Sequence, residues 1–81
     1  LEALALEGAL AYVVGDTATF EARAAEAIKI HPSYGEYYRV AGAVTAGYYR
    51  FDEAVEHVRR AIQLDREHWR AYADLGTHLL R

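Results

Sequence analysis

The chain has 81 residues, of which 53% are hydrophobic and 26% are charged, and its formal net charge is −3 at pH 7. That length allows one small domain, and the hydrophobic content excludes a disordered tail. Nucleic-acid binding needs a basic face, so we expect no nucleic-acid partner for this mildly acidic chain. There is no cysteine, which excludes a disulfide framework and thiolate chemistry. The sequence does not fix the compartment, although we favour the cytoplasm.

Two helices are predicted before the only proline. Residues 1–14 are rich in Ala and Leu, which are strong helix formers, and carry apolar side chains on nearly every face. We therefore expect another part of the protein to cover this helix. It is shorter than the roughly 20 residues that span a bilayer, so we expect no membrane insertion. Gly15–Thr17 ends it, and Asp16 or Thr17 can cap a second helix, which begins near Ala18 and ends before Pro32.

Three further helices are predicted after Pro32. Ser33 and Glu36 match the capping-box pattern, in which each side chain satisfies a backbone donor at the start of a helix. A turn-like run, residues 47–52, separates this third helix from a fourth, which is strongly amphipathic and ends near Leu64. A fifth helix then runs toward the end of the chain. No segment shows a strand pattern, so the sequence predicts an all-α fold of about five helices.

The sequence repeats itself at a fixed interval. A shift of 34 places Gly8 on Gly42 and Gly42 on Gly76, and it also places Tyr38 on Tyr72. Fixed periods of this size are typical of stacked supersecondary units. The small residues at the repeated positions would allow neighbouring helices to pack closely, and we expect Gly8, Ala24, Gly42, Ala54 and Gly76 to do so.

The central unit carries the features that identify the repeat: Tyr38, Ala41, Gly42, the run 50–54 and the run 61–65. This pattern, with its 34-residue period, resembles the tetratricopeptide repeat (TPR) family. The resemblance covers the whole chain, as a divergent first repeat (1–34), a complete second repeat (35–68) and the first helix of a third (69–81). It implies a right-handed superhelical array of antiparallel helix hairpins, and we expect the chain to be part of a longer protein.

The resemblance also implies a concave groove that binds a protein or peptide partner. On that register the groove is lined by Glu2, Ala5, Ala9, Tyr12, Glu36, Arg39, Ala43, Ala46, Arg70, Ala73 and Thr77. One subclass of the family grips a partner's terminal carboxylate with Asn, Lys and Arg side chains. This chain has no Asn, and alanines stand where such a clamp needs polar groups, so we do not assign it to that subclass.

The sequence gives little support for metal binding or catalysis. No two of the histidines His31, His57, His68 and His78 lie three or four residues apart, so we expect no metal site and exposed or half-buried imidazoles. The chain has no serine besides Ser33, no glycine-rich phosphate loop and no carboxylate pair isolated in apolar surroundings, so we expect no catalytic residues and no cofactor. Among the tyrosines, Tyr37, Tyr38 and Tyr72 are predicted to be core or inter-repeat residues, with Tyr12 or Tyr48 as candidates for contact with a partner.

Two functions remain open from the sequence. The first is a protein–protein interaction scaffold that binds a peptide or helix in its groove. The alternative is a non-catalytic regulatory or architectural segment of a larger enzyme, for example a bacterial peptidase, kinase or transferase. In either case, an array that ends without a polar capping helix exposes an apolar face. We therefore expect self-association of the isolated chain through Trp69, Leu75, Leu79 and Leu80.

Overall fold

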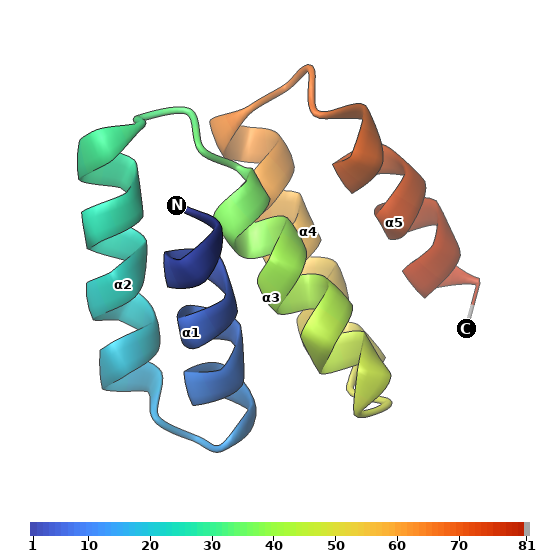
Figure 1. Cartoon of the computed structure of the whole chain (residues 1–81). Coiled ribbons are helices and arrows are strands. Elements are labelled where there is room, and N and C mark those ends of the chain that lie inside the picture. Colours follow the sequence, from blue (N-terminus) through green and yellow to red (C-terminus); the bar gives the residue numbers. More distant parts are fainter. Residues whose placement is uncertain (81) are drawn as a thin grey trace.

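A computed structural model of the chain describes residues 1–80. It contains five helices: α1 (Glu2–Val13), α2 (Thr17–Ile30), α3 (Glu36–Gly47), α4 (Phe51–Leu64) and α5 (Trp69–Leu79) (Figure 1). No strand occurs in this part of the chain, so the predicted all-α fold of about five helices is confirmed. Arg81, the last residue of the predicted third repeat, lies outside the described residues.

The first four helices form two antiparallel pairs of matching length. α1 and α3 have 12 residues each, and α2 and α4 have 14 residues each. Every bound of α3 and α4 follows the corresponding bound of α1 or α2 by one full repeat of the sequence, so that Glu36 corresponds to Glu2 and Phe51 to Thr17. Consecutive helices reverse direction at short turns (Figure 1). The two pairs are thus built alike, and α5 follows them as a single helix.

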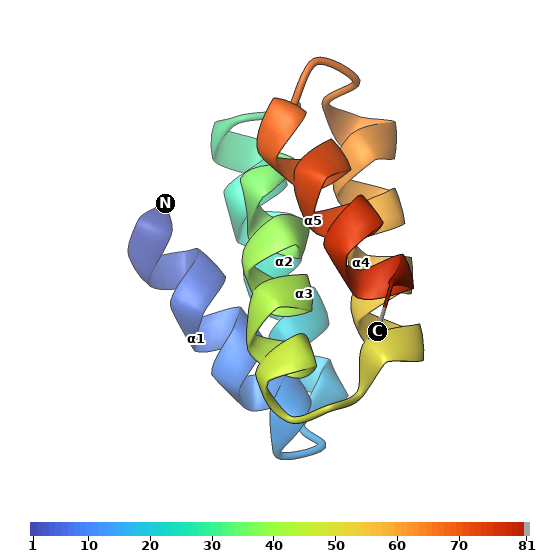
Figure 2. The same ribbon diagram turned by 90° about the vertical axis from the view of Figure 1, so that its right-hand side faces the viewer.

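α3 lies at the centre of the molecule. It packs extensively against α1 on one side and against α4 on the other, whereas its contact with α5 is slight. α5 packs mainly on α4, and Figure 2 shows it from the side that faces away from α1 and α2. α3 and α5 therefore meet only loosely.

Aromatic side chains fill the core where α1, α2 and α3 meet. Phe20, Tyr37 and Tyr38 are buried, and the ring centroids of Phe20 and Tyr37 lie 5.4 Å apart. The Tyr37 hydroxyl donates a hydrogen bond to the backbone carbonyl of Phe20, which satisfies the only polar atom of this buried ring. Gly8 makes room for Tyr37, because a methyl group at Gly8 would overlap its ring.

Helix starts follow the sequence prediction in one case and depart from it in another. The carboxylate of Asp16 accepts a hydrogen bond from the Thr19 amide at 3.1 Å, so the predicted cap of α2 is confirmed. The capping box at Ser33 and Glu36 is wrong. Gly35 precedes α3 and no side chain caps it. The carboxylate of Glu36 instead binds the positively charged guanidinium of Arg39, which forms stronger hydrogen bonds than a neutral backbone amide does.

Two residues of α5 lack the packing that was expected of them within residues 1–80. Tyr72, expected as a core or inter-repeat residue, is 49% exposed and does not belong to the core, unlike Tyr37 and Tyr38. Gly76 faces open space, since a methyl group there would meet no atom within 4 Å, so it does not serve a close helix contact. Both residues would be covered only if another element packed on the outer side of α5, and no element of residues 1–80 does so.

Candidate functional site

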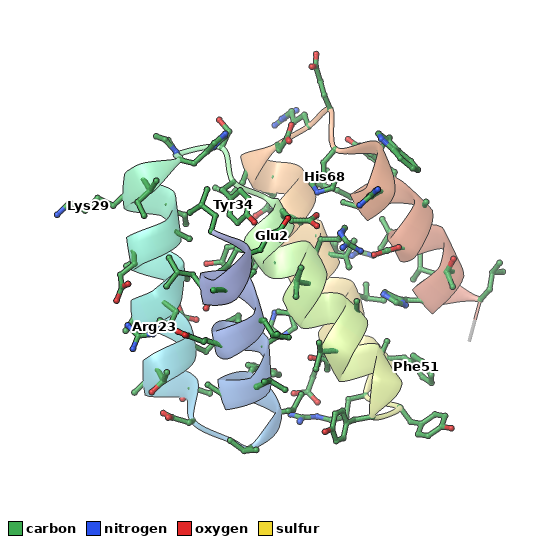
Figure 3. The ribbon with its side chains drawn as sticks, in the orientation of Figure 1. Glu2, Arg23, Lys29, Tyr34, Phe51 and His68 are labelled. Atoms are coloured by element: carbon green, nitrogen blue, oxygen red, sulfur yellow. The ribbon has the colours of Figure 1, made fainter. Side chains whose placement is uncertain are left out.

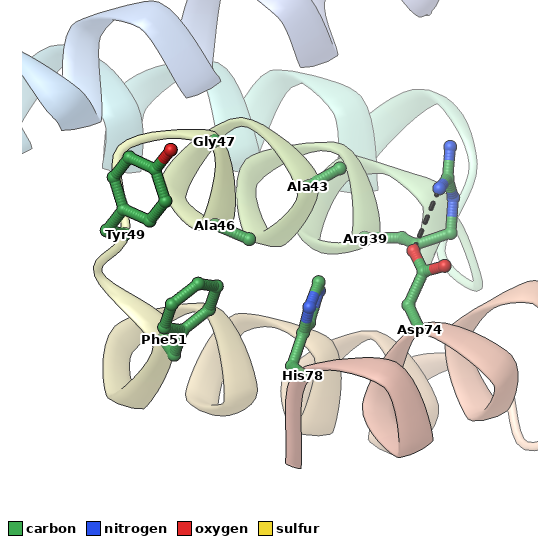
Figure 4. Close-up of a pocket in the computed structure, with 8 residues that line it drawn as sticks. All are labelled: Arg39, Ala43, Ala46, Gly47, Tyr49, Phe51, Asp74 and His78. Carbon is green, nitrogen blue, oxygen red and sulfur yellow. Dashed lines mark hydrogen bonds and ion pairs between the residues drawn. The ribbon is translucent and has the colours of Figure 1, made fainter. Parts of the chain in front are cut away.

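A cleft of about 420 Å³ lies between α3, the turn after it and α5, and we call it the α3–α5 cleft (Figure 4). It occupies the slight contact between these helices described above. The residues that line it are Arg39, Ala43, Ala46, Gly47, Tyr49, Phe51, Asp74 and His78. Alanines form much of the wall on α3. The cleft is open because these side chains are small and α5, which faces them, does not pack closely against α3.

Charged residues close one end of the α3–α5 cleft. Arg39 donates to both carboxylate oxygens of Glu36, at 2.6 and 3.0 Å, and to Asp74 of α5 at 2.9 Å. His68 Nε2 lies 2.7 Å from the Glu36 carboxylate, and Figure 3 labels His68 at the start of α5. These four residues therefore tie the beginning of α5 to α3.

The ionic states of this network follow from its contacts. Burial alone would raise the pKa of Glu36, but hydrogen bonds from Arg39 and His68 outweigh it and hold the pKa below its ordinary value. Hydrogen bonds to Glu36 and Asp74 raise the pKa of Arg39, against the effect of its burial. Arg39 is therefore permanently charged, and its guanidinium already has two carboxylate partners. Its main role is to hold α5 rather than to offer an uncommitted cation.

Aromatic residues border the opposite end of the cleft. Tyr49 follows the last turn of α3, where its amide donates to the carbonyl of Ala46 at 2.9 Å. It has a backbone φ of 62°, in the left-handed region that favours glycine, and this conformation costs about 1–2 kcal/mol for other residues. Its side chain is nevertheless 82% exposed, and its ring lies 6.1 Å from that of Phe51 in an edge-on arrangement. The turn therefore presents a large exposed ring beside the cleft.

His78 lies at the centre of the cleft and points from α5 toward α3 (Figure 4). Its side chain is buried, at 9% relative exposure, and neither ring nitrogen has a hydrogen-bond partner within residues 1–80. An imidazole carries at least one donor, and leaving a buried polar atom without a partner costs about 1–3 kcal/mol. A polar group entering the cleft could remove that penalty if the ring turned toward it.

Part of the groove predicted from the sequence coincides with this cleft. Arg39, Ala43 and Ala46 line it, and Glu36 belongs to the network at its charged end. Four other predicted residues are exposed but do not line it, namely Glu2, Arg70, Ala73 and Thr77. The structure therefore brings together the predicted residues of α3 but not those of α5.

The prediction is wrong for two groove residues on α1, and a third, Tyr12, lies away from the α3–α5 cleft. Ala5 and Ala9 have relative exposures of 1% and 0% and belong to the core, because α3 packs closely against α1. Tyr12 is turned toward α4, where its hydroxyl donates to Glu53 at 2.6 Å. The register that places Arg39 and Ala43 of α3 at an open cleft therefore places their equivalents on α1, Ala5 and Ala9, inside the molecule.

Sequence reasoning missed Tyr49, Phe51, Asp74 and His78 as cleft residues. Tyr49 carried a signal, because it stands in a turn where the resemblance leads one to expect glycine. His78 follows Asp74 by one helical turn, so both lie on one face of α5. Nothing in the sequence showed that this face would meet α3 so loosely.

The histidines are also less exposed than predicted. His57 and His78 are buried, whereas His68 is half-buried and His31 is exposed. Residues 1–80 contain no group of three or more His, Asp or Glu side chains placed to hold a metal ion. Within the same range, no helix combines the length and the apolar character that crossing a membrane requires. Compared with known protein families and curated proteins, the sequence shows no match.

Proposed function

We propose that this chain is a protein-interaction module that binds a polypeptide segment of a partner in the α3–α5 cleft. The observation that carries the proposal is the cleft itself, which joins a buried imidazole without a hydrogen-bond partner to a strained, exposed tyrosine. An apolar side chain of the partner would lie against Ala46 and the ring of Tyr49. A polar group of the same segment would reach His78. The proposal gives the chain no catalytic role.

We further propose that the helix pairs stack as TPR-like units of a right-handed superhelix. Two observations support this arrangement. The bounds of α1 and α2 recur one repeat later in α3 and α4. Gly8 and Gly42, which occupy the same position of the repeat, both face a neighbouring helix so closely that a methyl group would overlap Tyr37 or Val58. In such an array the α3–α5 cleft would be one segment of a longer groove.

A library of random displayed peptides selected against the wild-type chain would test the binding proposal. Ala43 is exposed and lines the cleft, so Ala43→Gln fills the cleft without disturbing the core. Ala22→Gln is the matched control, since Ala22 is exposed on α2. We expect selected peptides to lose at least about tenfold in affinity for Ala43→Gln, because the added side chain occupies their place. Failure to select any saturable binder, or equal affinities for the two variants, would contradict the proposal.

A second candidate function rests on the outer surface of α1. Leu6 and Leu10 are about half exposed on this helix, where nothing in residues 1–80 covers them. They favour the alternative of an architectural segment that packs against a neighbouring part of a larger enzyme. In the full-length protein, Leu6→Gln with Leu10→Gln would then speed hydrogen exchange in the adjoining domain. Ala43→Gln would not, so the two functions are distinguishable.

A further inference from the structure

A second cleft, of about 350 Å³, lies between the first halves of α2 and α4, and we call it the α2–α4 cleft. It shares no lining residue with the α3–α5 cleft. Its floor is aromatic and its rim carries several carboxylates. The function proposed above makes no use of it.

Three rings form the floor of the α2–α4 cleft. The ring centroid of Tyr12 lies 4.3 Å from the ring centroid of His57, and the two rings are nearly perpendicular. The same centroid of Tyr12 lies 5.1 Å from the ring centroid of Phe20. His57 is only 5% exposed, and both of its ring nitrogens lack a hydrogen-bond partner in the described part of the chain. Burial lowers the pKa of His57 to about 4, helped by Arg60 and Arg50 and opposed by Glu53. The floor is therefore uncharged at neutral pH, and the imidazole retains a lone pair that can accept a hydrogen bond.

The rim of the cleft is mainly acidic. Glu53 accepts hydrogen bonds from Arg50 and, more weakly, from Tyr12, which lower its pKa to about 2 and keep it ionised. Asp52 and Glu56 also line the cleft, are exposed, and form no ion pair within residues 1–80. The carboxylates, with Glu21, outnumber the single cation of the lining, Arg60.

Arg60 leaves part of this negative charge unbalanced. Its guanidinium lies 4.3 Å from the centre of the Tyr38 ring and 3.6 Å from Glu21, so it is committed to the α2 side of the cleft. The side of α4 that carries Asp52 and Glu56 keeps its negative potential. An occupant of this cleft should therefore be cationic.

The spacing of the acidic groups decides between kinds of cation. These carboxylates and His57 do not form a group that could hold a metal ion. Carboxylates spread around an aromatic floor suit a larger organic cation, because the floor contributes ring contacts and the rim contributes charge. The chain's own Arg50 illustrates such contacts at this edge. Its guanidinium lies 5.3 Å from the centre of the Tyr12 ring and 2.7 Å from Glu53.

We propose that the α2–α4 cleft binds an arginine side chain of a partner polypeptide, with its guanidinium against the aromatic floor and paired with Asp52 and Glu56. Arginine fits better than lysine because its planar group stacks on rings and bonds carboxylates in a fork. The site lies apart from the α3–α5 cleft, so a partner could occupy both clefts or only one.

The test is a titration of the whole chain with N-acetylarginine N-methylamide, followed by nuclear magnetic resonance signals of the His57 and Tyr12 rings. We expect saturable shifts confined to these rings and Phe20. The citrulline analogue, which has the same shape without the charge, should produce no saturable shift. Equal shifts with citrulline, or no saturation up to the solubility limit of the arginine probe, would overturn the proposal.

Charge-matched variants make the test specific. Asp52→Asn with Glu56→Gln should weaken binding of the arginine probe about tenfold, since each ion pair near a surface contributes up to about fivefold. Glu2→Gln with Glu67→Gln removes the same charge from exposed residues outside the cleft and should change the affinity less than twofold. Similar weakening in both double variants would show a general attraction to an acidic protein and overturn the site. Ala43→Gln should bind the probe normally, which separates this result from failure of the α3–α5 cleft.

Discussion

Gly8 and Gly76 occupy equivalent positions of the repeat, but Gly8 is closely packed and Gly76 is not. Gly8 lies against the ring of Tyr37, whose hydroxyl is fixed by the carbonyl of Phe20. Gly76 lies within α5 and faces no atom within 4 Å. In a helix interior, glycine is less favourable than alanine by about 0.5–1 kcal/mol unless the space is needed.

We therefore expect Gly8→Ala and Gly76→Ala to change stability in opposite directions. Gly8→Ala should lower the free energy of unfolding by about 1–3 kcal/mol, because the new methyl group must displace a packed ring. Gly76→Ala should raise it by about 0.5–1 kcal/mol, because the helix gains a better former at no steric cost. Urea unfolding followed by circular dichroism measures both values. A stabilised Gly8→Ala variant would show that Tyr37 is not held as described.

His57 should make stability depend on pH. Its folded pKa of about 4 lies below its ordinary value of 6.5, so the unfolded chain binds a proton there in a range where the folded chain does not. The free energy of unfolding should then decrease as pH falls from about 6.5 to about 4, by at most about 3 kcal/mol. Above pH 6.5, His57 is neutral in both the folded and the unfolded chain, so the free energy of unfolding is not reduced by its protonation there.

His57→Phe isolates that effect, because it keeps an aromatic ring in the same place and removes the titrating group. Urea unfolding at a series of pH values should show a shallower decrease between pH 6.5 and 4 for this variant than for the wild type. All other residues are the same in the two proteins, so the comparison isolates the contribution of His57. Identical slopes would mean that His57 is accessible to protons in the folded state.

Among the helices, α5 depends on polar contacts with α3 more than any other helix does. Its apolar contacts are mainly with α4, while Asp74 and His68 reach the Arg39–Glu36 pair on α3. These side chains are partly shielded from solvent, so their hydrogen bonds should contribute more than a fully exposed pair.

Asp74→Asn should loosen α5 selectively. The substitution leaves the shape nearly unchanged and removes the charge that Arg39 binds, so we expect opening of α5 to become easier by about 1 kcal/mol. Hydrogen exchange of α5 amides should accelerate about fivefold, while exchange in α1 and α2 stays the same. Thr77→Val, on the exposed side of α5, serves as a control. Uniform acceleration throughout the chain would instead indicate that α5 and the other helices open together.

The number and order of helices could be predicted from the sequence because each element carries its own signal. Asp16, Pro32 and the glycine-containing turn at 47–52 mark boundaries locally, and the period of the repeat supports them. The fourth helix even held a signal for burial of His57, which follows Ala54 by three residues and precedes Ala61 by four, on the same apolar face.

Contacts between elements could not be predicted in the same way. The capping box at Ser33 failed because Glu36 meets Arg39 and His68, and the latter lies 32 residues away. The α3–α5 cleft could not be predicted, because its width depends on the position in which α5 packs against α4. A periodic pattern tells which face of a helix is apolar, but it does not tell how closely the next helix approaches.

At the scale of the whole molecule, the apolar surface is distributed unevenly. Trp69, Leu79 and Leu80 are strongly exposed on or next to α5. Leu75, which was expected among them, is half-buried against the core and contributes less. Neighbouring exposed apolar side chains favour association, because burying them removes apolar area from water.

Self-association of the chain should therefore increase with concentration and depend on α5. Sedimentation velocity should show a rising average mass for the wild type and a lower mass for Leu79→Gln with Leu80→Gln. Val14→Gln with Ile30→Gln removes as many exposed apolar side chains at other places and should leave the association unchanged. A wild-type chain that stays monomeric up to about 1 mM would contradict the expectation, because a dissociation constant above about 1 mM corresponds to a binding free energy of less than about 4 kcal/mol.

The slight contact between α3 and α5 has a thermodynamic consequence for ligand binding. A segment that occupies the α3–α5 cleft touches both helices, so it binds only while α5 is docked. By mass action, a ligand at one hundred times its dissociation constant adds about 2.7 kcal/mol to the docked state. Occupied chains should hence exchange their α5 amides much more slowly than empty ones. Hydrogen exchange of the α5 amides would then report whether the α3–α5 cleft is occupied. The reason is that ligand binding is linked to local unfolding of α5, without any change of fold.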